Sequence, residues 1–221
     1  MLNPLGVMPG VKTAVVIRGL KLDQATEVRV GDWKDAAKIV KKGAATVPKP
    51  LEPAKTGDQQ VEVEITLPAD APLGSVNVVV ITPDGETAPQ PLLVDAPGSL
   101  VDEKEPNNGF REAQAIDGAH IVQGSIQQPQ DVDVFRYDGE AGEKVAFEIV
   151  AARQGSALDS ILTLFDGKQR ILAVNDDHGG SPDSLLEFTL PAKGPYFVSV
   201  QDAHDLGGNS HPYRLIVRSA K

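Results

Sequence analysis

Val61-Glu62-Val63-Glu64-Ile65-Thr66-Leu67 places an aliphatic side chain at every second position and a charged or polar one between. In an extended chain, successive side chains point to opposite faces, so the four aliphatic residues share one face and the two glutamates the other. A period of two over seven residues predicts an antiparallel strand that is buried on one side.

Similar short apolar runs surround this stretch in the first half of the chain. The run at 76–81 is closed by Pro83-Asp84-Gly85, which is typical turn chemistry. The segment 33–40 could form one short helical turn, and it is the strongest helical candidate in this half. Other strands are predicted at 12–18 and 27–30.

The second half repeats this pattern with strands about 10–15 residues apart. Several strands carry an apolar triplet on one face, as in Val145, Phe147 and Ile149, which favours a jelly-roll or a related sandwich. The segment 110–116 is predicted to form a short helix with Asn108 as its N-cap. Strands are predicted at 120–126, 134–137, 144–151, 161–165, 171–174, 185–190, 196–200 and 213–217.

The segment 94–99 separates the two halves with proline, glycine and serine, the usual composition of a domain boundary. A chain of 221 residues is long enough for two sandwiches of about 100 residues each. The sequence therefore predicts an all-β protein with two β-sandwich domains, residues 1–97 and residues 98–221. The start of the chain leads almost directly into strand-like sequence, as if it continued a longer polypeptide.

Charge is distributed unevenly between the two predicted domains. Residues 1–97 hold 10 Lys and Arg against 12 Asp and Glu, whereas residues 98–221 hold 11 against 19. This acidic balance excludes nucleic acid as the expected partner and makes a cation the natural one for the second half.

The chain contains no cysteine, which excludes disulfides, thiolate catalysis and cysteine-based metal sites. Its first residues lack the layout of a signal peptide, and no apolar run is long enough to predict a membrane span. The sequence carries no signal for the oligomeric state.

Three features of the first half occur in order: Ile17-Arg18-Gly19-Leu20, Val28-Arg29-Val30-Gly31, and the loop 67–74 followed by the strand and turn of 76–85. Together they resemble immunoglobulin-fold repeats of the IPT/TIG type. The resemblance covers roughly residues 9–95 and implies a spacer or binding module without chemistry of its own. A fibronectin-III-like sandwich is the alternative for this half.

Eight motifs follow one another in the second half: Glu103-Lys104-Glu105-Pro106-Asn107-Asn108, Gly124-Ser125-Ile126, Asp131-Val132-Asp133-Val134-Phe135-Arg136-Tyr137, Gly142-Glu143-Lys144-Val145, Leu158-Asp159-Ser160-Ile161-Leu162, Asn175-Asp176-Asp177, Gly194-Pro195-Tyr196-Phe197-Val198-Ser199-Val200 and Tyr213-Arg214-Leu215. In this order they resemble the bacterial pre-peptidase C-terminal (PPC) domain, over about residues 102–218. The family is appended to secreted peptidases and other exported proteins, and collagen-binding domains of clostridial collagenases are similar in architecture. The resemblance implies a non-catalytic accessory region that is extracellular, periplasmic or at the cell surface.

The resemblance also implies a calcium site, because calcium-binding relatives take their ligands from the first and third of these motifs. Ca²⁺ prefers six to eight oxygen ligands, several of them carboxylates. We expect calcium here to link the segment between the domains to the strand that carries the two aspartates. Asn108 stands where some relatives carry aspartate, which removes one charge. The implied ligands are Glu103, Glu105, Asn107, Asn108, Asp131 and Asp133.

A second acidic cluster lies farther along the chain, where Gly179-Gly180 loosens the loop. It is interpreted primarily as a hydrophilic turn between strands, and alternatively as a second cation site or a recognition loop. Its members are Asp159, Asn175, Asp176, Asp177 and Asp183.

Two further hypotheses compete with the accessory role. A hydrolase would use carboxylates or a histidine, but no zinc-binding or G-x-S-x-G motif is present. We therefore expect no enzyme activity and predict that the histidines are surface loop residues (His120, His178, His204 and His211). A module that binds an extracellular protein or polymer, such as a polysaccharide or collagen-like chain, would use exposed aromatics. Tyr137, Tyr196 and Tyr213 are the candidates, although their spacing is typical of core packing.

Overall fold

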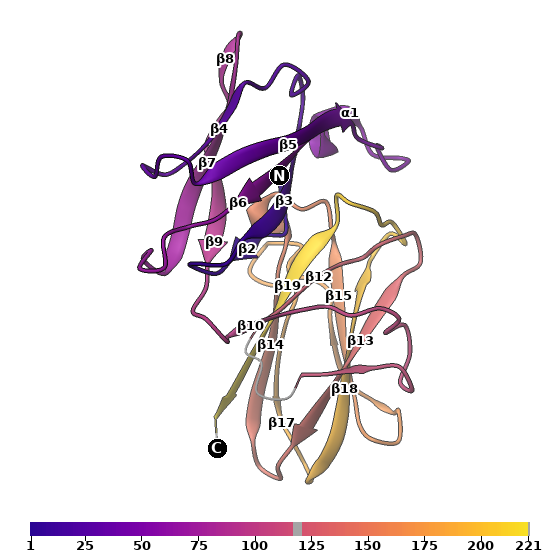
Figure 1. Ribbon diagram of the computed structural model, residues 1–221. Helices are drawn as coiled ribbons and strands as arrows, with labels where there is room; N and C mark the ends of the chain where they lie inside the picture. The colour runs from indigo at the N-terminus through magenta and orange to yellow at the C-terminus, as the bar shows by residue number, and fades with distance from the viewer. Residues whose placement is uncertain (117–120, 221) are drawn as a thin grey trace. The chain divides into compact units, whose positions relative to one another are not determined.

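A computed structural model describes residues 1–116 and 121–220, and almost all of its regular structure is β-strand. The chain divides into two compact units, each containing two sheets (Figure 1). The first unit comprises Met1–Pro97 with Gln154–Ala157, and the second comprises the described residues of Gly98–Arg153 and Leu158–Lys221. The predicted all-β class with two β-sandwich domains is confirmed.

In the first unit the alternating stretch forms β6 (Gln59–Ile65), which pairs antiparallel with β3 and β5. Val61, Val63 and Ile65 are at most 1% exposed, so the predicted apolar face is the core face. The sheets have the orders β1-β3-β6-β5 and β2-β9-β7-β4, with β8 paired to β7. The remaining elements are β1 (Leu2–Asn3), β2 (Gly6–Val7), β3 (Thr13–Gly19), β4 (Glu27–Val30), β5 (Ala37–Ala44), α1 (Pro53–Thr56), β7 (Gly74–Thr82), β8 (Gly85–Glu86) and β9 (Gln90–Val94).

The second unit consists of two five-stranded sheets, ordered β10-β12-β19-β14-β17 and β11-β13-β18-β15-β16. Strands β10 and β11 join their sheets as parallel edge strands, and the other pairings are antiparallel. The strands are β10 (Leu100–Asp102), β11 (Gln114–Ala115), β12 (Ile121–Ser125), β13 (Val132–Gly139), β14 (Lys144–Val150), β15 (Ser160–Phe165), β16 (Ile171–Asn175), β17 (Leu185–Thr189), β18 (Gly194–Asp202) and β19 (Pro212–Ala220).

The core of this sandwich includes aromatic side chains from both sheets. Phe135, Phe147 and Tyr213 are fully buried, and Tyr196 is 3% exposed. The Tyr137 ring meets Phe147 edge to face, with the ring centroids 5.7 Å apart. The suggestion that the three tyrosines form an exposed binding platform is therefore wrong for Tyr196 and Tyr213, because both rings fill the interior.

The two helical expectations are also wrong. Residues from Ala37 onward belong to β5, where pairing with β6 outweighs the weak helical pattern of 33–40. Residues 110–116 contain a turn followed by β11, which pairs with β13. The Phe110 ring makes edge-to-face contacts with Phe165 and Phe197 at centroid distances of 5.0 and 5.2 Å, so this segment is held against the sheet.

The strand predicted at 120–126 is observed as β12, and His120 lies outside the described residues. No helix within residues 1–116 and 121–220 has the length and apolarity needed to cross a membrane.

Candidate metal centre

Glu103 follows β10 directly and is anchored to β12, because its backbone nitrogen donates to the carbonyl of Gln123 at 2.9 Å. Farther on, the carbonyl of Asn107 accepts a hydrogen bond from the nitrogen of Val134 in β13. The segment from Glu103 to Asn108 thus makes backbone bonds to strands of both sheets of the second unit, and it belongs to that unit. The segment that was expected to lie between the domains is therefore part of the second unit.

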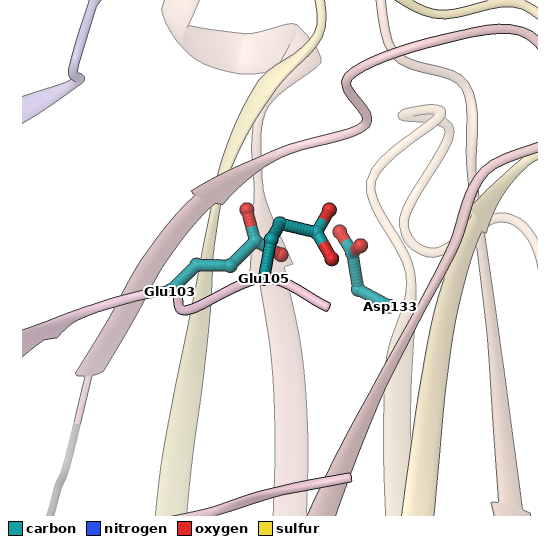
Figure 2. A group of neighbouring side chains, drawn as sticks. All are labelled: Glu103, Glu105 and Asp133. Atoms are coloured by element: carbon teal, nitrogen blue, oxygen red, sulfur yellow. The ribbon is translucent and has the colours of Figure 1, made fainter. Parts of the chain in front are cut away.

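Three carboxylates meet where this segment crosses the sandwich. Glu103, Glu105 and Asp133 each offer one oxygen, and these oxygens all lie within 4.8 Å of one another. Figure 2 shows the carboxyl groups of Glu105 and Asp133 facing each other, with that of Glu103 beside them. Within the parts of the chain that the structure describes, this is the one group of three His, Asp or Glu side chains close enough to hold a metal ion together.

Hydrogen bonds fix the Glu103 carboxylate in place. Its Oε1 accepts from the Asn107 side-chain amide at 3.0 Å and from the Tyr213 hydroxyl at 2.9 Å. Its Oε2 accepts from the backbone nitrogen of Ser125 at 3.0 Å. Tyr213 also donates to Asp133 Oδ2 at 2.7 Å, so one hydroxyl proton faces two carboxylates.

Two oxygens at this place have no hydrogen-bond partner among the described residues: Asn107 Oδ1 and Asp133 Oδ1. Both side chains are fully buried. Buried polar atoms are normally paired, and each exception requires an explanation such as an ion. Three converging carboxylates, one of which has an unpartnered oxygen, together with the unpartnered oxygen of Asn107, fit a bound cation.

The electrostatics of the cluster agree with this fit. Burial raises the pKa of Asp133 to about 10, and the neighbouring Glu103 and Asp131 carboxylates reinforce that shift. Burial also raises the pKa of Glu105, with Asp131 and Glu103 adding to it. Without a cation, the site therefore favours the neutral form of Asp133; a divalent cation reverses this preference by stabilising the ionised carboxylates.

Two of the six implied ligands have other partners. Asp131 precedes β13, and its Oδ1 and Oδ2 accept from the Asn108 side-chain amide at 3.0 Å and from the backbone nitrogen of Gln127 at 2.7 Å. Asp131 is the residue directly before β13, and Asp133 is the second residue of that strand. Asp131 and Asn108 are thus bonded to each other beside the cluster, and this hydrogen bond holds the Glu103–Asn108 segment against the start of β13.

Tyr213 and Gly124 were not identified from the sequence as members of this site. A Cβ on Gly124 would lie 2.8 Å from Glu103 Oε2 and 2.8 Å from the Tyr213 hydroxyl, so the missing side chain makes room for both groups. Each of the two residues belongs to one of the ordered motifs of the second half, and membership in these motifs was the only sequence signal that could have identified them. Their contact with Glu103 depends on strand pairing between distant segments.

The second acidic cluster is divided among different roles. Asp183 is 2% exposed, and its carboxylate accepts from the backbone nitrogens of three consecutive residues, Ala151 to Arg153. Asn175 bonds the nitrogen of Leu185 and the carbonyl of Asp177. Asp176 and Asp177 are exposed, while burial raises the pKa of the half-buried Asp159 and His204 opposes that shift.

Asp183→Asn is expected to destabilise the second unit by about 1–3 kcal/mol, because the amide nitrogen cannot accept a hydrogen bond and at least one of these backbone N–H donors loses its acceptor. Chemical denaturation with and without calcium measures the effect, which should be the same in both conditions. A loss seen only with calcium would instead make Asp183 part of a cation site. Asp177→Asn, at an exposed position of the same loop, is the matched control and should leave stability unchanged.

The prediction of surface histidines is wrong for His211, which is fully buried and has its Nδ1 3.1 Å from the hydroxyl of Ser210. His178 and His204 are exposed, and His120 lies outside the described residues.

Part of the second unit, including β13 with Asp133, matches a known family. Residues 131–202 match the family model of the bacterial pre-peptidase C-terminal domain. A probable subtilase-type serine protease from Deinococcus radiodurans is 32% identical over 214 residues, covering 92% of this chain and 28% of the relative. The chain thus spans less than a third of that relative's length.

Two solved structures show a partial likeness. The pre-peptidase C-terminal domain of a Bacillus anthracis collagenase has a TM-score of 0.40 and 17% identity, covering 52% of this chain and 100% of that domain. PliG of Aeromonas hydrophila, a periplasmic lysozyme inhibitor, has a TM-score of 0.37 and 21% identity, covering 55% of this chain and 96% of its own.

Proposed function

We propose that the chain is a non-catalytic accessory region of an exported protein, such as a secreted peptidase, because residues 131–202 match the family model of the bacterial pre-peptidase C-terminal domain. Its second unit is stabilised by calcium. The observation that carries the proposal is the convergence of Glu103, Glu105 and Asp133. Asp133 Oδ1 in this group and the neighbouring Asn107 Oδ1 are buried and have no hydrogen-bond partner among the described residues. The similarity to a subtilase-type protease supports the peptidase context.

The donor set favours calcium over other common ions. It consists of carboxylate oxygens and the amide oxygen of Asn107, with no sulfur and no histidine nitrogen. Oxygen-only sets suit hard cations, whereas zinc and copper favour nitrogen and sulfur. Mg²⁺ demands nearly ideal octahedral geometry and keeps several waters, whereas Ca²⁺ tolerates irregular sets of this kind.

Calcium would neutralise the repulsion among the three carboxylates and join the Glu103–Asn107 segment to β13. A metal that binds only the folded domain stabilises it by mass action. In a chain without cysteines, such a cross-link has the stabilising role that disulfides have in many exported domains. The proposal includes a location outside the cytoplasm, in the periplasm, at the cell surface or in the medium.

Calcium is expected to raise the melting temperature of the second unit by roughly 10 °C relative to EGTA, at about 100-fold excess over Kd. Differential scanning calorimetry measures this shift, and titration calorimetry should give one calcium per chain. Magnesium at the same concentration is the control and should produce a much smaller shift. Superimposable melting curves in calcium and EGTA would disprove the calcium site.

A further inference from the structure

Asn108 and Gly109 form the one Asn-Gly pair in the sequence, and they lie in the irregular segment between β10 and β11. Asparagine is a chemically labile residue. The backbone nitrogen of the next residue can attack its side-chain amide carbon, most readily when that residue is glycine. Asn108 is exposed to solvent, and Gly109 is half-buried.

The attacking nitrogen is not engaged elsewhere. Among the described residues, the backbone nitrogen of Gly109 donates no hydrogen bond, whereas its carbonyl accepts one from Glu112. A Cβ built on Gly109 would meet nothing within 4 Å, so the approach to this residue is open.

The side chain of Asn108 is held by two hydrogen bonds that bear on its reactivity. The backbone nitrogen of Asn107 donates to Asn108 Oδ1 at 3.3 Å, and Asn108 Nδ2 donates to Asp131 Oδ1 at 3.0 Å. A donor on the amide oxygen stabilises the negative charge that develops there during attack on the carbonyl carbon. The neighbouring Asn107 is not expected to react in this way, since its side chain is fully buried and donates a hydrogen bond to Glu103.

We propose that Asn108 is a site of spontaneous deamidation. The nitrogen of Gly109 forms a bond to Cγ of Asn108, and the bond from Cγ to Nδ2 breaks. The proton lost from the Gly109 nitrogen is balanced by the one gained by the departing ammonia. The resulting succinimide is opened by water, which restores the original backbone with aspartate or yields isoaspartate.

The product changes the site next to it. The amide that donated to Asp131 is replaced by a carboxylate, so a hydrogen bond becomes a contact between like charges. The new charge lies in the same segment as Glu103 and Glu105, so it adds to the repulsion within the cluster. If calcium binds at this cluster as proposed above, deamidation makes the stability of the second unit more dependent on calcium.

The test is a time course of the intact chain in mildly alkaline buffer, with calcium in one arm and EGTA in the other. Peptide mapping by mass spectrometry should show conversion of the amide to an acid at Asn108, with Asn107 unchanged. Conversion should be slower with calcium, because the ion holds the segment. Gly109→Ala is the matched variant, since its Cβ has space, and it should slow conversion at least tenfold.

An Asn108 that stays amidated in both arms, or a Gly109→Ala chain that converts as fast as the wild type, would overturn the proposal. Asn108→Asp reproduces one product directly. It should bind calcium roughly tenfold more tightly than the wild type and melt at a lower temperature in EGTA. Deamidation at equal rates with calcium and with EGTA, together with melting curves that do not depend on calcium, would support deamidation and refute the calcium site. The experiment therefore distinguishes failure of one proposal from failure of the other.

Discussion

Asp133→Asn is expected to stabilise the second unit in EGTA and to abolish its stabilisation by calcium, so that the order of wild type and variant reverses between the two conditions. Asp133 is fully buried, and its Oδ1 has no partner among the described residues. An asparagine keeps an acceptor for the Tyr213 hydroxyl and removes the cost of a buried carboxyl. We expect a gain of about 1–3 kcal/mol without metal and at least a 100-fold loss of calcium affinity.

The pH dependence of stability in EGTA gives an independent check. The folded-state pKa of Asp133, about 10, lies above its ordinary value of 3.8. The folded state therefore retains a proton that the unfolded state loses, so this contribution to stability is full below pH 3.8 and is lost as pH rises toward 10. Asp133→Asn should remove this slope.

Asp131→Asn is the matched control. Its carboxylate is satisfied by Asn108 and by the backbone nitrogen of Gln127, so the substitution should weaken the domain in both conditions and retain a calcium-dependent shift. Loss of that shift at Asp131, together with its survival in Asp133→Asn, would reverse the roles assigned to the two aspartates.

Gly124→Ala has the second-largest expected effect. Its Cβ would come within 2.8 Å of both Glu103 Oε2 and the Tyr213 hydroxyl, which is closer than real side chains approach. One of the two groups must move, and the hydrogen bond between them must lengthen. Because changes to groups that orient metal ligands typically cost 10–100-fold in affinity, we expect a loss of that size in calcium titrations.

Gly109→Ala is the control for Gly124→Ala, because it adds the same methyl group close to the site in open space. Its calcium affinity should equal that of the wild type. Wild-type affinity in Gly124→Ala would show that the Glu103 carboxylate is not a ligand in its present position.

The all-β class could be predicted from the sequence because it depends on local patterns. The alternation at 61–67 identified the core face of β6 before any partner strand was known, since neighbouring side chains in a strand necessarily point to opposite faces. The local signals failed where tertiary contacts outweighed them, as at 110–116, where the Phe110 contacts and the pairing of β11 replace the expected helix.

Composition and motif order also determined which residues are candidates for the cation site, because oxygen-rich segments can be recognised wherever they lie in the chain. Only the tertiary structure showed that Asp133 and not Asp131 belongs to the carboxylate cluster. It also showed that the Tyr213 hydroxyl donates to Glu103 and that Gly124 leaves space for both groups. These contacts join residues up to 110 positions apart. They depend on how β12, β13 and β19 are registered within two sheets, and the local alternation of side chains does not encode that register.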